Sequence, residues 1–226
     1  MPAQPLILAN DATGEYGSLA LARGVELLEE WPLHSPSGFA HVLFGRLSEL
    51  LARHGVKAAD IDCFASASGP GSFTGVRVGL AFTKGLAEAL GKPAVAVSNL
   101  RALAAFGSAP LRATVLDARR VEIYAAVYDA GGRAVCPEVV ANCGAWLERL
   151  PFDNLEFVSP DFPAFRSALA VTRYEKASLV TAPRALAGAI ARIAFTAYER
   201  GEAADPAALD ANYVRRSDAE LFWKEA

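Results

Sequence analysis

One segment of the chain, residues 66–80, combines residue types and spacing that could bind a ligand. It reads SASGPGSFTGVRVGL, an apolar strand that runs into a glycine-rich loop and then into a helix. Such loops can point backbone N–H groups at an anion, and Gly69, Gly71 and Gly75 are spaced much like a dinucleotide fingerprint. However, the loop does not follow the first strand, the next strand (PAVAVSN) ends without an acidic residue, and Lys84 is too far downstream for a phosphate-loop lysine. The pattern therefore disfavours dinucleotide binding.

A second candidate is the acidic residue at the first turn of the chain. Asp11 lies in the sequence NDATG, where the first two strands are joined. Its carboxylate either caps the turn or contributes, with Thr13 and Arg77, to a nucleotide or anion contact. A charged turn at 116–124 (LDARRVEIY) leaves the same choice between a solvated turn and an anion site.

The residues that most often act as nucleophiles or metal ligands are few and badly spaced. Two of the three histidines are seven residues apart with a proline and a glycine between them, so they cannot form an i, i+4 metal pair on one helix. The cysteines form no C-x-x-C pair, and no serine elbow or H-E-x-x-H sequence is present. The sequence therefore predicts neither a metal site nor a catalytic residue among these groups: His34, His41, His54, Cys63, Cys136 and Cys143.

Composition sets the class of protein. The 226 residues are 53% hydrophobic and 21% charged, which is typical of a folded globular chain. A net charge of -3 argues against a broad nucleic-acid surface. No apolar run approaches the ~20 residues that a membrane span needs, and the first residues lack the basic region of a secretory signal. Three cysteines that cannot all pair fit a reducing cytoplasm.

The elements that must position these residues follow from apolar periodicity. In the first half, glycines and prolines separate the apolar runs, and Pro32 is expected to end the third strand. Ser98 is expected to cap the last helix of this half. The expected strands are 6–8, 16–22, 25–31, 61–67 and 93–97, and the expected helices are 39–54, 75–90 and 100–106.

The second half restarts the same plan. LILANDATGEYGSLAL at 6–21 and ATVLDARRVEIYAAVY at 113–128 are each an apolar strand ending in Asp, a polar turn and an apolar return strand. Further strands are expected at 133–140 and 155–158, and helices at 142–150 and 184–200. Strand–strand–strand–helix–strand–helix thus occurs twice, which predicts an α/β fold with mixed sheets flanked by helices.

This duplicated plan is that of the actin, sugar kinase and Hsp70 (ASKHA, ribonuclease H-like) superfamily. We expect an N-terminal subdomain over 1–109, carrying partner-binding helices, and a smaller C-terminal subdomain with a tail over 110–226. In that tail, Tyr213, Phe222 and Trp223 are available to pack.

The helix expected at 75–90 has two neighbouring stripes of apolar or small residues, one through Gly75, Gly79, Phe82 and Leu86. Two stripes imply two packing partners, and interior glycines cost about 1 kcal/mol each relative to alanine. One partner is the sheet of its own domain. The second is either the helix at 39–54 or a helix from another chain.

Four segments, in order along most of the chain, resemble the TsaB (YeaZ) group of the bacterial glycoprotease-like (Gcp-like) family. They read LILANDAT, GPGSFTGVRVGLAFTKGLAEALGKPAVAVSNLRALA, VLDARRVEIYAAVYD and YVRRSDAE. Two positions depart from the family pattern: Asn10-Asp11-Ala12 stands where apolar-Asp-Thr is usual, and Pro36 to Phe39 replaces His-Ser-Glu. These departures put any site at the first turn in doubt.

The resemblance implies a role in making threonylcarbamoyladenosine next to the tRNA anticodon. It implies a non-catalytic subunit that activates its paralogue TsaD, with TsaE joining the pair, and a homodimer when alone. ATP and metal are expected on the partner subunits, and tRNA only as substrate of the complex. An independent ATP-dependent transferase or glycoprotease-like enzyme is the alternative, disfavoured because the His-x-x-x-His pair of the catalytic relatives is missing. The helices at 39–54 and 75–90 would form the interface through Phe39, Val42, Leu43, Leu47, Gly75, Val78, Gly79, Phe82 and Leu86.

Overall fold

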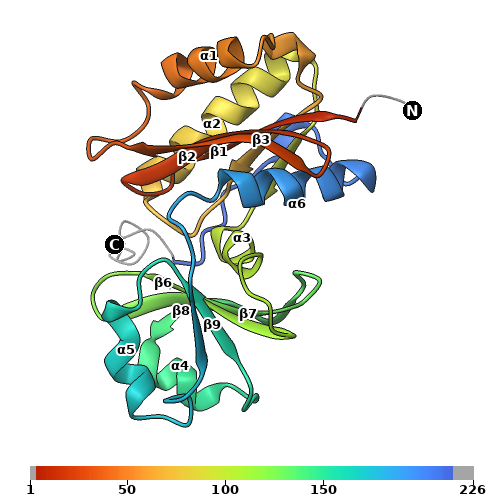
Figure 1. Cartoon of the computed structure of the whole chain (residues 1–226). Helices are drawn as coiled ribbons and strands as arrows, with labels where there is room; N and C mark the ends of the chain where they lie inside the picture. Colours follow the sequence, from red (N-terminus) through yellow and green to blue (C-terminus); the bar gives the residue numbers. More distant parts are fainter. Residues whose placement is uncertain (1–3, 216–226) are drawn as a thin grey trace, which may run out of the picture. The chain divides into compact units, whose positions relative to one another are not determined.

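The computed structural model describes residues 4–215, and the chain divides into two compact units (Figure 1). Unit 1 is built from the chain up to Asn99 together with Arg184–Asn212, and unit 2 from Leu100–Pro183 with the residues from Tyr213 onwards. Unit 1 is therefore assembled from two separate stretches of sequence.

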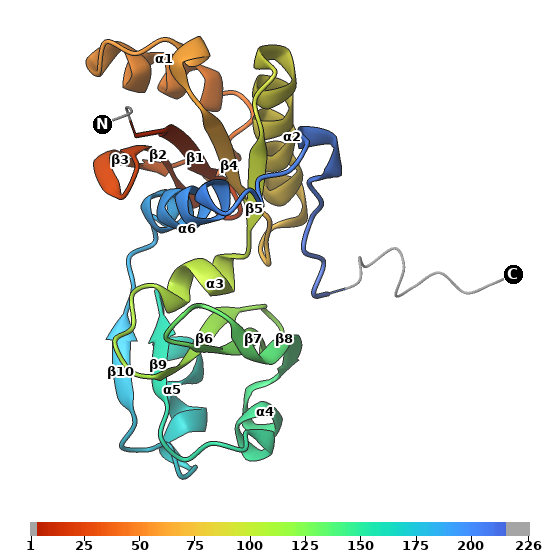
Figure 2. The same ribbon diagram turned by 90° about the vertical axis from the view of Figure 1, so that its right-hand side faces the viewer.

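Unit 1 has a five-stranded mixed sheet in the order β3-β2-β1-β4-β5. Strand β1 pairs antiparallel with β2 and parallel with β4. Helices α1 and α2 lie on one face of the sheet and α6 on the other, as Figures 1 and 2 both show. The bounds are β1 (Leu6–Asp11), β2 (Tyr16–Arg23), β3 (Glu26–His34), α1 (Leu43–Arg53), η1 (Ala58–Asp60), β4 (Cys63–Ala67), α2 (Phe73–Leu90), β5 (Ala94–Val97), α6 (Ala187–Glu199) and η2 (Pro206–Ala208).

The two faces of this sheet are covered by helices of different composition. Large aliphatic and aromatic side chains fill the side of α1 and α2, among them Phe39, Leu43, Leu50 and Phe64. The side of α6 is covered by buried residues in the sequence AGAIA, from Ala187 to Ala191, which are all small except Ile190. Because alanine and glycine project little, α6 lies close against β1, β2 and β4.

Unit 2 repeats the plan of unit 1. Its sheet has the order β10-β9-β6-β7-β8, with β6 antiparallel to β7 and parallel to β9. Helices α4 and α5 pack on one face around Trp146, Phe157 and Phe165. The bounds are α3 (Asn99–Ala104), which leads into the unit, β6 (Leu111–Asp117), β7 (Glu122–Asp129), β8 (Ala134–Asn142), α4 (Cys143–Arg149), β9 (Glu156–Ser159), α5 (Pro163–Ala170) and β10 (Ser178–Thr181).

The two halves thus share β-β-β-α-β-α-β, with equivalent strand orders 3-2-1-4-5 and 8-7-6-9-10. The duplicated α/β fold predicted from the sequence is confirmed. Two elements of the second copy, α5 and β10, were not predicted, and both complete the equivalence with α2 and β5.

Two predicted boundaries were wrong for local reasons. The third strand does not end before Pro32 but runs to His34, with Pro32 opposite Ser18. Proline is tolerated there because β3 is an edge strand, so the missing N–H costs no ladder hydrogen bond. The first helix begins at Leu43 instead of Phe39, whose carbonyl accepts the N–H of Val42 in a turn (3.0 Å).

The division into units also differs from the linear boundary expected at 109/110. Helix α6 belongs to unit 1, although it follows the long stretch Leu100–Pro183 of unit 2 in the sequence. The reason is the single strip of small residues on α6, which matches the uncovered face of the first sheet. Of the tail residues expected to pack, Tyr213 is exposed, while Phe222 and Trp223 lie outside the described part of the chain.

Candidate functional site

The first turn of unit 1 is a buried polar network centred on Asp11. Its Oδ1 accepts hydrogen bonds from the backbone N–H of Thr13 (2.9 Å) and from the Thr13 hydroxyl (2.7 Å). Its Oδ2 accepts from Nδ2 of Asn99 (3.3 Å), which also donates to Thr13 Oγ1 (2.8 Å). The structure therefore brings Asp11 and Thr13 together, as predicted, and adds Asn99, which the sequence did not indicate.

Burial governs the protonation of this carboxyl group. Asp11 is almost fully buried, and desolvation raises its pKa above the ordinary value, although the hydrogen bonds from Thr13 and Asn99 act to lower it. Both carboxylate oxygens accept hydrogen bonds from this chain. The arrangement ties the end of β1 to Asn99 at the start of α3, and it favours the turn-capping interpretation of Asp11 over ligand binding.

The glycine-rich loop packs on the same turn. A Cβ at Gly71 would lie 2.6 Å from the Thr13 carbonyl oxygen, and one at Gly75 would lie 2.3 Å from the carbonyl oxygen of Ala12. The N–H of Ser72 donates to the Thr13 carbonyl (2.7 Å), and the Ser72 hydroxyl caps α2. The glycines are thus needed for close approach to the chain's own hairpin, because any side chain there would strike backbone atoms.

The third predicted contact residue lies apart from this network. Arg77 is on the exposed side of α2, with its guanidinium 3.6 Å from the centre of the Phe73 ring. This cation–π contact occupies one face of the Phe73 ring. Nucleotide or anion binding by Asp11, Thr13 and Arg77 as one group remains a prediction.

The second charged turn, between β6 and β7 in unit 2, has an unusual backbone. Arg119, Arg120 and Val121 all have positive φ, at 63°, 54° and 65°. Asp117 stabilises the turn by accepting the N–H of Arg119 at Oδ1 (2.7 Å). From the other side, Arg215 pairs with Glu122 and donates to the carbonyl of Ala118 (2.9 Å).

Most residues predicted for the partner interface point into unit 1. Phe39, Leu43, Leu47 and Phe82 belong to its hydrophobic core. Gly79 faces β1 and β4, since a Cβ there would lie 2.8 Å from Asn10 Oδ1 and 3.2 Å from Ser66 Oγ. The remaining four are partly buried: Val42, Gly75, Val78 and Leu86. Packing within the unit therefore accounts for the small residues at Gly75 and Gly79. An interface with a second chain through the nine predicted residues stays a prediction.

A different face of α1 and α2 is open to solvent. Phe44 on α1 is 61% exposed and meets Phe82 edge to face, with ring centres 5.0 Å apart. On α2 the exposed residues include small ones at i, i+4 and i+8, namely Ala81, Gly85 and Ala89, and a Cβ at Gly85 would meet nothing within 4 Å. We call this the α1–α2 face. Sequence reasoning missed it, although a phenylalanine outside the apolar stripe of the first helix was the available signal.

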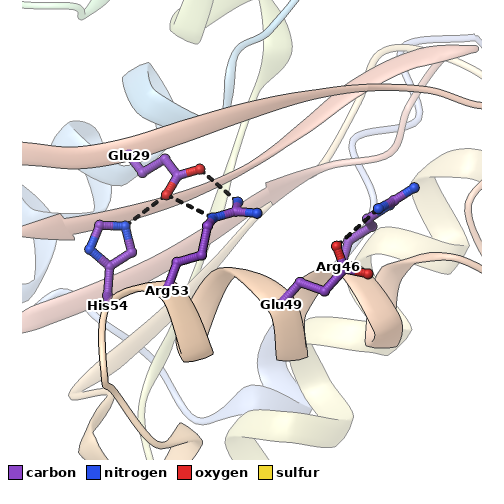
Figure 3. Close-up of polar contacts among 5 residues, drawn as sticks. All are labelled: Glu29, Arg46, Glu49, Arg53 and His54. Atoms are coloured by element: carbon purple, nitrogen blue, oxygen red, sulfur yellow. Dashed lines mark hydrogen bonds and ion pairs between the residues drawn. The ribbon is translucent and has the colours of Figure 1, made fainter.

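Polar contacts fix α1 on the edge of the sheet. Glu29 on β3 accepts hydrogen bonds from Arg53 Nη2 (2.6 Å) and Nε (3.3 Å), and it lies 2.8 Å from Nε2 of His54 (Figure 3). The Arg53 guanidinium also lies 3.9 Å from the centre of the Trp31 ring. Burial of Glu29 acts to raise its pKa, but the hydrogen bonds from Arg53 and His54 outweigh this effect and hold the pKa below its ordinary value.

Over residues 4–215, no cluster of three or more His, Cys, Asp or Glu side chains is arranged to hold a metal ion. In the same part of the chain, none of the helices combines the length and apolar character required to cross a membrane.

Comparison with known proteins gives three similarities. The tRNA threonylcarbamoyladenosine biosynthesis protein TsaB of Bacillus subtilis is 29% identical, covering 97% of this chain and 98% of that protein. The structure of YeaZ from Pseudomonas aeruginosa matches with a TM-score of 0.78 at 27% identity, over 93% of this chain and all of the other. Component A of the Acidaminococcus fermentans (R)-2-hydroxyglutaryl-CoA dehydratase matches with a TM-score of 0.50 at 10% identity, covering 85% and 98% of the two chains.

The last of these likenesses concerns the fold alone, and it agrees with the duplicated sheet order described above. The first two run through both units, over nearly the whole chain, and they fit the TsaB/YeaZ resemblance carried by the glycine-rich block at 69–75. The family model TsaD, described as tRNA N6-adenosine threonylcarbamoyltransferase, matches residues 38–196. Because the matched residues make up more than half of this chain, the chain belongs to the TsaD family. Within that family it is similar to the TsaB/YeaZ proteins.

Proposed function

We propose that this chain is a non-catalytic subunit in the biosynthesis of threonylcarbamoyladenosine in tRNA, and that it activates TsaD by pairing with it. Membership of the TsaD family and the name of the Bacillus subtilis relative support the pathway. Activation through pairing is the finer part of the proposal and rests on the α1–α2 face.

The observation that carries the pairing is the small-residue surface of α2. Ala81, Gly85 and Ala89 are exposed on one side of the helix. Contact of these small side chains with water does not stabilise the folded chain. An approaching helix can pack closely on such a surface, and Phe44 of α1, whose ring contacts Phe82 of α2, adds exposed apolar area. Homodimers of this chain alone would use the same face.

The non-catalytic part of the proposal is supported by the closed network at the first turn. Asp11 and Thr13 use their side chains to hold Asn99 and each other, so these groups are already engaged. ATP and metal then belong to the partner subunits TsaD and TsaE, and tRNA is substrate of the complex, which would act in the cytoplasm. An independent ATP-dependent transferase or glycoprotease-like enzyme would need a reactive group outside this network.

The test is a titration of this chain against a fixed amount of TsaD, with TsaE, ATP, threonylcarbamoyl-adenylate and tRNA supplied. Modification should rise until one copy is present per TsaD and then stay constant, because a binding partner shifts TsaD between states only through its differential affinity for them. Full activity at a small fraction of one copy would mean turnover by this chain and would overturn the proposal. Threonylcarbamoyl transfer without TsaD would do the same.

A further inference from the structure

Unit 2 has a groove that takes no part in the proposed pairing and on which the family assignment does not rest. It has a volume of about 310 Å³ and lies where three segments meet: the β6–β7 turn, the start of α4 and the end of α5. Its lining residues are Asp117, Val121, Glu122, Ile123, Asn142, Cys143, Gly144, Glu148, Ser167, Ala168, Val171 and Thr172.

Two valines at this groove are unusually exposed. Val121 is 83% and Val171 is 85% exposed, more than any other large hydrophobic residue among those that the structure describes. Val121 also has a φ of 65°, which a β-branched residue rarely adopts. The backbone of the turn therefore presents an apolar side chain to solvent, at a site where a polar residue or glycine would cost less.

Arg215, the last residue that the structure describes, lies beside this groove. Arg215 pairs with Glu122, one of the lining residues, and its Nη1 donates to the carbonyl of Ala118 (2.9 Å). The same guanidinium lies 5.6 Å from the centre of the Tyr124 ring. Three contacts thus fix the position from which the last eleven residues, 216–226, continue.

Those eleven residues contain one concentrated apolar block. Leu221, Phe222 and Trp223 follow one another, with polar or charged residues and one alanine between them and Arg215. Phe222 is seven positions after Arg215, and an extended chain of that length spans up to about 23 Å. This reach is sufficient to return the block to the groove next to which Arg215 is fixed.

We propose that Leu221, Phe222 and Trp223 bind in this groove of the same chain, covering Val121 and Val171. The bound segment comes from the same chain because Arg215, the residue just before the last eleven, is already fixed beside the groove. This connection keeps the local concentration of the apolar block in the millimolar range. The proposal does not depend on the pairing with TsaD, since the groove and the α1–α2 face belong to different units.

Disulfide trapping in the full-length chain tests this binding. The variant pair Val171→Cys and Phe222→Cys places one thiol at the groove and one in the apolar block. The control pair is Val25→Cys and Phe222→Cys, because Val25 is 69% exposed but lies on the β2–β3 turn. Of the native cysteines, Cys136 is replaced by serine, while burial raises the pKa of Cys63 to about 12 and that of Cys143 above its ordinary value, so both react slowly.

Mild oxidation at micromolar protein should link residues 171 and 222 within one chain, at least about tenfold faster than the control pair. The rate should not depend on protein concentration, and changing Leu221 and Trp223 to serine should lower it several-fold. A bond from residue 222 to Cys143 also supports the proposal, because Cys143 lines the groove. Equal rates in the two pairs, or links between chains that grow with concentration, would overturn it.

Discussion

The carboxylate of Glu30 on β3 accepts a hydrogen bond from the backbone N–H of Gly188, at 2.9 Å and 158 residues further along the chain. Ser18 accepts the neighbouring N–H of Ala187 at 2.9 Å and itself donates to Glu30 (3.1 Å). The first turn of α6 is therefore capped by two strands of the sheet on which it packs. Glu30 also lies at the end of the helix where negative charge is stabilising.

Replacing Glu30 with alanine should destabilise unit 1 by removing this cap. Loss of an N-terminal cap costs about 1 to 2 kcal/mol, which corresponds to a decrease of a few degrees in the midpoint of thermal unfolding. Calorimetry measures this midpoint. Glu26→Ala, which removes an exposed carboxylate from the same strand, is the control and should change the midpoint by much less. Equal effects would mean that the cap contributes nothing beyond surface charge.

The Glu29 contacts with Arg53 and His54 should make stability depend on acid pH. The pKa of Glu29 is lowered in the folded state, so its contribution is present above the ordinary value of 4.5 and is lost as pH falls through the folded pKa. Urea unfolding from about pH 7 to about pH 3 should show wild type and Glu29→Gln converging as the pH falls below 4.5. Glu49→Gln, which breaks the exposed pair with Arg46, is the control. A constant difference between wild type and Glu29→Gln would contradict the prediction.

Two glycines of α2 should respond oppositely to a large side chain. Gly85→Leu should leave unit 1 folded, since its Cβ meets open space, but it should weaken association with TsaD by about tenfold or more if the α1–α2 face is the contact. Gly79→Leu should destabilise the unit itself, because its side chain would strike Asn10 and Ser66. Sedimentation measures association and circular dichroism measures folding. Full-strength pairing by a folded Gly85→Leu would remove the interface assignment.

Asp11 should matter for stability more than for the reaction. In Asp11→Ala, the N–H of Thr13 and the amide of Asn99 lose an acceptor in a buried site, at about 1 to 3 kcal/mol for each unsatisfied group. Under conditions where the variant is folded, tRNA modification by the complex should fall less than tenfold, or about 1.4 kcal/mol. A loss of several orders of magnitude in a folded variant that still pairs with TsaD would instead make this chain catalytic.

Much of the fold was predictable because its strands are short apolar runs between strong turn signals. Asp11 and Asp117 mark the same turn in the two copies, and Gly55 and Gly91 follow the ends of α1 and α2. Strand β10 gave no such signal, since its four residues are mostly exposed. Helix α5 did carry one, a proline at its first position, but its apolar stripe is only two turns long.

The candidate site was harder to predict because periodicity shows which side of a helix is apolar but not which element covers it. The sequence predicted two packing partners for the helix of Gly79, its own sheet and a second helix, but it did not show which stripe meets which partner. The positions of Asn10 and Ser66 place Gly79 against the sheet. Asn99 joined Asp11 from 88 residues away, which no local pattern indicates. The helical pattern of α6 was likewise clear from the sequence, but the sheet on which the helix packs was not.

The late position of α6 in the sequence has a consequence for synthesis on the ribosome. The last strand of the first sheet ends at Val97, whereas α6 begins at Ala187, so the stretch Leu100–Pro183 of unit 2 is translated between them. At 5 to 20 residues per second, one face of that sheet lacks its covering helix for roughly 5 to 20 s. During this interval the nascent chain exposes an apolar surface that chaperones recognise, and a stop codon anywhere before α6 would leave it exposed permanently.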